Sequence, residues 1–157
     1  MELKPIGLIH SPFKNQAGTP IQPRFAEESV RGHVEIFEPY VEALDDLEGF
    51  ERIWLLFHLD RARPWKPKVI PYRDTVERGL FSTRAPARPN PLGLSVVRLL
   101  SRQGSRLIVG GLDILDGTQL FDIKPYSPKF DAFPESQAGW LDRGQVTDQA
   151  DKRFDED

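Results

Sequence analysis

Fourteen prolines and twelve glycines interrupt this chain of 157 residues, so few stretches have room for a helix of several turns. The apolar and alternating segments between them are short, which is typical of strands joined by turns. Helical spacing of Val41, Leu44 and Leu47 after Pro39 predicts a single short helix that ends at Gly49. We expect strands at residues 6–9, 30–36, 53–57, 79–83, 94–100, 107–112 and 120–123.

Crossover helices between these strands are absent from the pattern after the first third of the chain, which argues against a parallel, doubly wound sheet. The pattern therefore predicts a mostly-β fold, either an antiparallel β-barrel or a β-sandwich. The length suits one domain with one core. The run Ile53–Phe57 consists of large apolar residues, and it predicts a strand covered on both faces.

Charge and composition limit the partners. The net charge is −3, and residues 148–157 alone contribute five acids and two bases, so residues 1–147 are neutral and offer only local basic patches to nucleic acid. The sequence has no cysteine, and His10, His33 and His58 show no metal-ligand spacing, so we expect no metal site. No apolar run reaches membrane-spanning length, so we expect a cytoplasmic protein that makes no membrane contact.

Two motif interpretations fail on inspection. No G-x-G-x-x-G follows a predicted strand, which excludes the usual dinucleotide-binding fingerprint. The stretch from Asp113 to Thr118 reads DILDGT and is similar to the D-x-D-G-T loop of aspartate-nucleophile phosphatases. Ile114 occupies the position of the nucleophile, so that chemistry is excluded.

Three blocks carry a more specific resemblance. They are GLFSTR at residues 79–84, RPNPLGLSVV at 88–97 and LDILDGTQLFDIKPY at 112–126, and the segments PIGLIHSP, PIQP and IWLLFHLD precede them in matching order. Over roughly residues 5–131 the chain resembles the TsaA-like family, which includes the TrmO-type tRNA methyltransferases. The resemblance implies a compact antiparallel β-barrel with one or two short helices, in a domain over residues 1–136. The C-terminal segment, 137–157, ends in an acidic tail that its charge predicts to be disordered.

The resemblance also implies an activity. Members of this family dimerise, hold S-adenosylmethionine near the subunit interface and methylate N6 of threonylcarbamoyladenosine at position 37 of tRNA. The family's cofactor positions correspond to Gln22, Pro23, Arg24, Leu59, Asp60, Arg84, Leu94, Asp113, Ile114, Leu115 and Asp116. Longer bacterial members carry a C-terminal extension, whereas few residues follow Tyr126 here. A different methyl acceptor and a non-catalytic cofactor-binding protein therefore stay open as alternatives to tRNA methylation.

The same residues have a physical interpretation of their own. The carboxylates of Asp60, Asp113 and Asp116 suit the ribose hydroxyls or the ammonium group of the cofactor, although Asp-Gly is also common turn chemistry. Prolines stiffen the loop that carries Arg84 and Arg88, so that less entropy is lost when an arginine there grips a carboxylate or phosphate. A surface ion pair explains these arginines equally well.

Two further groups of residues are candidates for substrate chemistry. Asp122, Lys124 and Tyr126 alternate along a predicted strand and share one face, which suits either proton transfer or a purely structural network. Trp65 lies among cations, including Lys66 and Lys68, in a proline-rich loop; with Arg88 they form the best local candidate for RNA contact. A solvated loop packed by its tryptophan is the competing interpretation.

Overall fold

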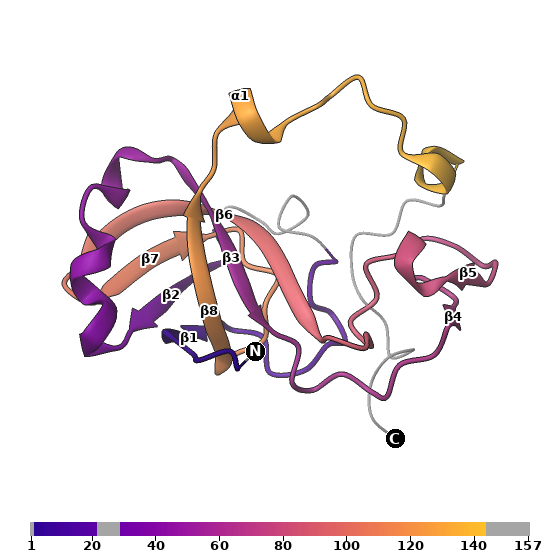
Figure 1. Ribbon diagram of the computed structural model, residues 1–157, viewed down its shortest axis with the longest axis horizontal. Coiled ribbons are helices and arrows are strands. Elements are labelled where there is room, and N and C mark those ends of the chain that lie inside the picture. Colours follow the sequence, from indigo (N-terminus) through magenta and orange to yellow (C-terminus); the bar gives the residue numbers. More distant parts are fainter. Residues whose placement is uncertain (1, 22–28, 144–157) are drawn as a thin grey trace.

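The computed structural model describes residues 2–21 and 29–143. Its main body is a closed barrel of six strands in the order β1-β2-β7-β6-β3-β8, and every neighbouring pair is antiparallel. Figure 1 shows these strands arranged around a common interior. The barrel strands are β1 (Gly7–His10), β2 (Arg31–Ile36), β3 (Arg52–His58), β6 (Leu92–Gln103), β7 (Arg106–Gly110) and β8 (Thr118–Pro125). The prediction of a mostly-β antiparallel barrel is confirmed.

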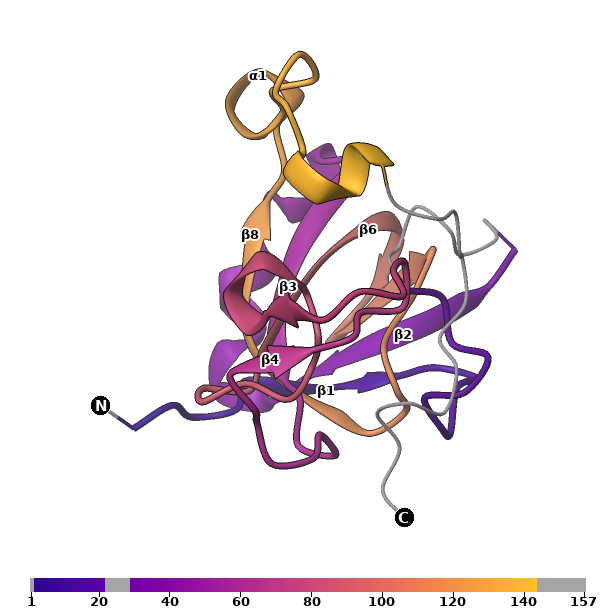
Figure 2. The ribbon, with the colours of Figure 1, turned by 90° about the vertical axis from the view of Figure 1, so that its right-hand side faces the viewer.

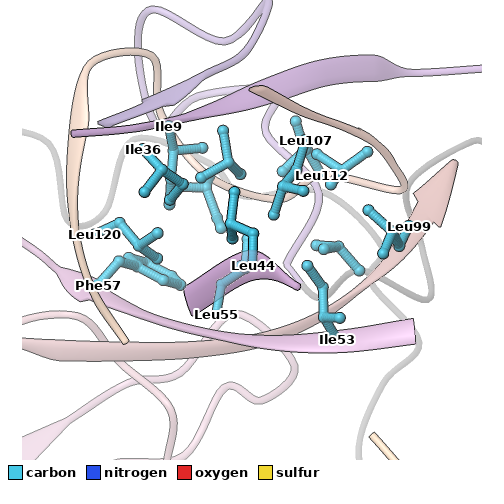
Figure 3. Packing of buried hydrophobic residues seen from close by; sticks show 14 residues of the cluster. Ile9, Ile36, Leu44, Ile53, Leu55, Phe57, Leu99, Leu107, Leu112 and Leu120 are labelled. Carbon is cyan, nitrogen blue, oxygen red and sulfur yellow. The ribbon is translucent and has the colours of Figure 1, made fainter. Parts of the chain in front are cut away.

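Period-two alternation places one apolar set inside the barrel. On β3, Ile53, Leu55 and Phe57 are buried while the intervening residues are half-buried, and β6 alternates in the same way. Leu44, from the 3-10 helix η2 (Glu38–Leu44), packs into the same cluster and lies among the strand side chains in Figure 3. The expectation that β3 is covered on both faces is therefore wrong within this chain, because only its inward face is fully buried.

Gly93 shows how tightly one end of the barrel is packed. It pairs with Phe57 across β3 and β6, and a Cβ added to it would lie 2.2 Å from the phenyl ring. The ring therefore occupies the space that any larger residue at position 93 would need. This close packing fixes the entrance to β6, which follows directly on the proline-rich loop 84–91.

A small arm extends from the barrel. It contains β4 (Lys68–Val69), β5 (Arg78–Gly79) and the 3-10 helix η4 (Leu80–Ser82), and it lies to the right of the barrel in Figure 1 and in front of it in Figure 2. After β8 the chain forms the short helix α1 (Pro128–Asp131) and then spans to the 3-10 helix η5 (Gly139–Arg143). There the indole N–H of Trp140 donates to the carbonyl oxygen of Ser82 at 2.8 Å, which ties this C-terminal strap, residues 127–143, to the arm.

Two local predictions are wrong. The expected single helix over residues 39–49 is instead two 3-10 helices, η2 and η3 (Leu47–Gly49), because Asp46 adopts a left-handed conformation at φ 67° and breaks the helical path. The expected strand 79–83 shrinks to β5, since η4 begins directly after Gly79. None of the described helices has the length and apolar character needed to cross a bilayer.

Candidate ligand-binding site

The turn between β7 and β8 brings two aspartates to one end of the barrel. Gly111 and Gly117 have left-handed φ angles of 72° and 78°, which glycine adopts without strain and which bend the chain on either side of Asp113 and Asp116. The amide of Gly117 donates to the carbonyl of Ile9 at 2.8 Å, which anchors the turn to β1. The two carboxylates therefore occupy fixed positions.

Asp116 is fully engaged within the fold. Its Oδ1 accepts the amide N–H of Ser11 at 3.1 Å and its Oδ2 accepts the ammonium group of Lys14. Its carbonyl oxygen accepts Nη2 of Arg61 at 2.8 Å. The hydrogen bond from Lys14 holds the pKa of Asp116 below its ordinary value. A structural role in the turn therefore explains Asp116, because it joins the turn to the segments that follow β1 and β3.

Asp113 has the opposite character. Its carboxylate accepts a hydrogen bond from the Ser95 hydroxyl, which points inward from β6, and the positive charge of Arg84 acts on it. Oδ1 of Asp113 is shielded from solvent and has no hydrogen-bond partner among the residues that the structure describes. Burial raises the pKa of Asp113 to about 7 because the hydrogen bond and the arginine only partly oppose it.

Such an enclosed acceptor is the feature expected of a binding site. A buried oxygen without a donor costs free energy, so a ligand that brings a hydroxyl or ammonium group would satisfy it. Arg84 supplies a cation beside this acceptor for an anionic part of the same ligand. The structure thus brings together two of the predicted cofactor residues, Arg84 and Asp113, which are distant in the sequence.

The other predicted cofactor residues are placed less uniformly. The amide of Leu59 donates to the carbonyl of Pro91 at 2.7 Å, so the end of β3 is tied to the start of β6. Asp60 is exposed and lies 3.6 Å from Nε of Arg61. Ile114 packs in the core, whereas Leu94 points outward with 55% of its surface exposed. Leu115 is half-buried, and Gln22, Pro23 and Arg24 lie outside the described residues.

Arg88 stiffens the proline-rich loop from within. Its Nη1 donates to the carbonyl oxygens of Thr83 and Ala85 at 3.0 and 3.3 Å, and its guanidinium lies 5.6 Å from the ring centre of Phe81. These contacts bind the loop to itself. Arg88 therefore holds the backbone around Arg84 in shape, and an RNA contact would be an additional role.

The basic loop borders a hollow of about 600 Å³ between residues 63–70 and 74–77. Arg63, Lys66 and Lys68 line it together with Asp74 and Glu77. Trp65 is 51% exposed, as an aromatic side chain available for stacking would be. Lys66 and Lys68, two of the cations predicted for RNA contact, thus line this hollow, whereas Arg88 binds back to its own loop.

The residues proposed for proton transfer lie further along β8. Lys124 Nζ is 2.9 Å from Asp122 Oδ2, and the ring of Tyr126 packs edge-on against Trp54 at 5.8 Å. Lys124 pairs with Trp54 across β3, whereas the turn aspartates lie beyond the other end of β8. Within one chain, this group and the Arg84–Asp113 pair therefore occupy different parts of the barrel surface.

Two features escaped the sequence interpretation. Ser95 is a polar residue at an inward position of an alternating strand, and that mismatch was the available signal for its contact with Asp113. The histidines His10 and His33 show no metal-ligand spacing in the sequence, yet they lie directly opposite each other on β1 and β2, with Glu35 beside them. Only the strand register brings these three side chains together.

Comparison with known proteins places this geometry in a family. The sequence pattern of the tRNA-methyltransferase O N-terminal domain matches residues 8–132. The chain belongs to this family. It is 45% identical to an S-adenosyl-L-methionine-binding protein of Archaeoglobus fulgidus, over 83% of this chain and 93% of the relative. It is 34% identical to the tRNA (adenine(37)-N6)-methyltransferase of Escherichia coli, over 95% of this chain and 67% of that enzyme.

Solved structures of the family share the fold. The crystal structure of TrmO from Pseudomonas aeruginosa superposes with a TM-score of 0.79 and 39% identity, covering 93% of this chain. The chain spans only 65% of that TrmO chain. The family assignment predicted from the three sequence blocks is therefore confirmed, and it applies to the barrel.

Proposed function

We propose that this protein is an S-adenosylmethionine-dependent methyltransferase that modifies N6 of an adenine in tRNA. The observation that carries the proposal is the enclosed Oδ1 of Asp113, which lacks a donor among the described residues. The positive charge of Arg84 acts on the same carboxyl group and lowers its pKa. Its support from outside the structure is the similarity to relatives named as S-adenosyl-L-methionine-binding proteins and tRNA methyltransferases.

The residues fit the chemistry of the cofactor. The ribose diol and the ammonium group of S-adenosylmethionine are donors that would satisfy Asp113. The carboxylate of the cofactor would accept two hydrogen bonds from the guanidinium group of Arg84. When bound, the cofactor supplies an electrophilic methyl group on its sulfonium. The protein then needs to orient the acceptor nitrogen in line with that methyl group and to exclude water.

The acceptor that we propose is N6 of threonylcarbamoyladenosine at position 37 of tRNA. Arg63, Lys66 and Lys68 would neutralise phosphates, and the exposed ring of Trp65 would stack an unpaired base of the anticodon loop. The nitrogen loses a proton during transfer, and Asp122, Lys124 and Tyr126 are the candidates that we retain for moving it. Of the three, the carboxylate of Asp122 is the acceptor, because the ammonium group of Lys124 and the phenol of Tyr126 already carry their protons. We place this activity in the cytoplasm.

We also propose that two copies assemble to complete the site. Large apolar side chains are exposed on either side of the Arg84 loop, namely Phe81 at 79%, Leu92 at 36% and Leu94 at 55%. A cluster of exposed apolar side chains next to a binding residue is typical of a surface that another chain covers. A second copy docked there would enclose the cofactor between subunits, as the family resemblance implies.

The test has a binding arm and a transfer arm. Calorimetric titration with S-adenosylmethionine should show binding that Arg84→Ala and Asp113→Asn each weaken at least tenfold. Arg98→Ala should leave the affinity unchanged, because Arg98 lies further along β6 in an exposed pair with Glu51. Equal affinity in all four proteins would remove the Arg84–Asp113 pair from the site.

In the transfer arm, labelled methyl groups should pass to tRNA from cells that lack this gene. The product should be methylated threonylcarbamoyladenosine, and tRNA that lacks the threonylcarbamoyl group should be a poor acceptor. Equal transfer to tRNA with and without the threonylcarbamoyl group would still support methyltransferase activity but would contradict the proposed substrate. Tight cofactor binding with no transfer to any tRNA would favour a cofactor-binding protein without catalysis.

A further inference from the structure

The outer face of β1 and β2 carries a compact group of metal-ligating side chains. His10 and His33 are register partners, and their rings stack with centroids 4.5 Å apart and planes inclined by 22°. Glu35 follows His33 by two residues on β2, so its side chain shares the same face. One ligand atom from each of the three residues lies within 4.8 Å of the others.

The two nitrogens of His10 have different surroundings. Nδ1 lies 3.6 Å from Oδ1 of Asp116, whereas Nε2 lies 3.4 Å from Oε2 of Glu35. Nε2 is shielded from solvent and makes no hydrogen bond to any part of the chain that the structure describes. In a metal-binding histidine a carboxylate commonly orients one ring nitrogen and leaves the other nitrogen for the ion. Asp116 lies where it could do this after a small movement, because 3.6 Å is only slightly longer than a hydrogen bond.

The distances suit a small transition-metal ion. Zinc binds imidazole nitrogen and carboxylate oxygen at about 2.0–2.2 Å, which places tetrahedral ligands about 3.3 Å apart. The 3.4 Å between Nε2 of His10 and Oε2 of Glu35 is close to this value. The ligand atoms of all three residues lie within 4.8 Å of one another, and the three residues are half-buried, so a wider separation would close by side-chain rotation when the ion binds. Two imidazoles and one carboxylate favour zinc over magnesium or calcium, which prefer oxygen ligands.

One neighbouring charge opposes an ion at this place. Arg106 on β7 is the register partner of Glu35, so its guanidinium competes for the carboxylate and repels a cation. The carboxylate of Asp116 acts in the opposite direction, although Lys14 already pairs with it. The group is therefore suited to moderate rather than very tight metal binding.

We propose that His10, His33 and Glu35 bind a divalent transition-metal ion of the zinc class, with Asp116 positioning the ring of His10. The fourth coordination position faces solvent and takes water. This site lies on the outer strand face, and no step of the proposed methyl transfer depends on it. Measurement of metal binding alone therefore tests the proposal.

The experiment uses the full chain after treatment with a chelator. Titration with zinc should show one equivalent bound per chain, and cobalt should give the visible absorption of a tetrahedral complex. His33→Gln and Glu35→Gln should each weaken zinc binding at least tenfold and abolish the cobalt absorption. Thermal unfolding shows whether each variant is folded, and either one alone is sufficient for the test.

His58→Gln is the matched control. His58 is the remaining histidine of the sequence, it lies at the end of β3 and it packs against Phe121 with ring centres 5.7 Å apart. This variant should bind zinc as tightly as the natural chain. The proposal is overturned if the natural chain binds zinc no better than His33→Gln, or if His58→Gln weakens binding as much.

Discussion

The hydroxyl of Ser95 donates a hydrogen bond to the carboxylate of Asp113 across the end of the barrel, from β6 to the turn that follows β7. This interaction lowers the pKa of the Asp113 carboxyl without satisfying Oδ1, which is enclosed and has no donor among the described residues. A residue of a barrel strand therefore affects the pKa of a carboxyl group in the candidate site.

Stability should depend on pH through Asp113. Its pKa in the folded protein is about 7, above the ordinary value of 3.8, so the carboxyl stabilises the fold at low pH and this contribution is lost as pH rises toward 7. Between pH 5 and pH 8, the natural chain should lose roughly 2–3 kcal/mol of unfolding free energy relative to Asp113→Asn. Urea unfolding of both proteins at the two pH values measures this difference. A difference that stays constant would show that the carboxyl titrates near its ordinary pKa.

Gly93→Ala should destabilise the barrel. The added Cβ would lie 2.2–2.7 Å from atoms of the Phe57 ring, and a packed core accommodates such a methyl group only by shifting, at a cost of roughly 1–3 kcal/mol. Gly79→Ala is the control, because its Cβ meets nothing within 4 Å and its φ of −58° suits any residue. Chemical denaturation should separate the two variants, and equal stabilities would mean that the Phe57 ring moves aside freely.

Removal of two charges from the basic loop should weaken tRNA binding without affecting the cofactor. If Lys66 and Lys68 each neutralise one phosphate, the double variant Lys66→Gln/Lys68→Gln should make the dependence of log K on log salt concentration shallower by about 1.4. Lys129→Gln, on α1, removes an exposed charge outside the hollow and serves as the control. Filter binding over a range of salt concentrations checks the slopes. Unchanged slopes in the double variant would place the RNA elsewhere.

Leu94→Glu should shift the proposed dimer toward monomer, because a carboxylate would replace an exposed leucine beside the Arg84 loop. Leu100→Glu is the matched control. It makes the same change on the same strand, at the end remote from Leu92. Sedimentation equilibrium gives the dissociation constants. A natural chain that is monomeric at high concentration would contradict the assembly itself, and equal weakening by both variants would place the interface elsewhere.

The antiparallel, mostly-β fold was predictable from the sequence because period-two alternation and turn residues are local signals. The choice of a barrel over a sandwich came from the family resemblance. The helix over residues 39–49 was mispredicted because apolar spacing does not register the left-handed conformation of Asp46. Arg84 and the turn aspartates were predicted together from sequence motifs, but the different roles of Asp113 and Asp116 were not. Which carboxylate meets Lys14 and Ser11, and which meets Ser95, depends on contacts between strands distant in the sequence.

Closure of the barrel has a consequence for how the molecule meets others of its kind. Each of the six barrel strands has a hydrogen-bonded neighbour on both sides over part of its length, so none of them offers a complete free edge to an incoming polypeptide. Recruitment of a foreign strand by the barrel, the first step of many amyloid-like assemblies, is thereby disfavoured. Association through the barrel surface therefore depends mainly on side-chain contacts, which substitutions can alter without disturbing the sheet.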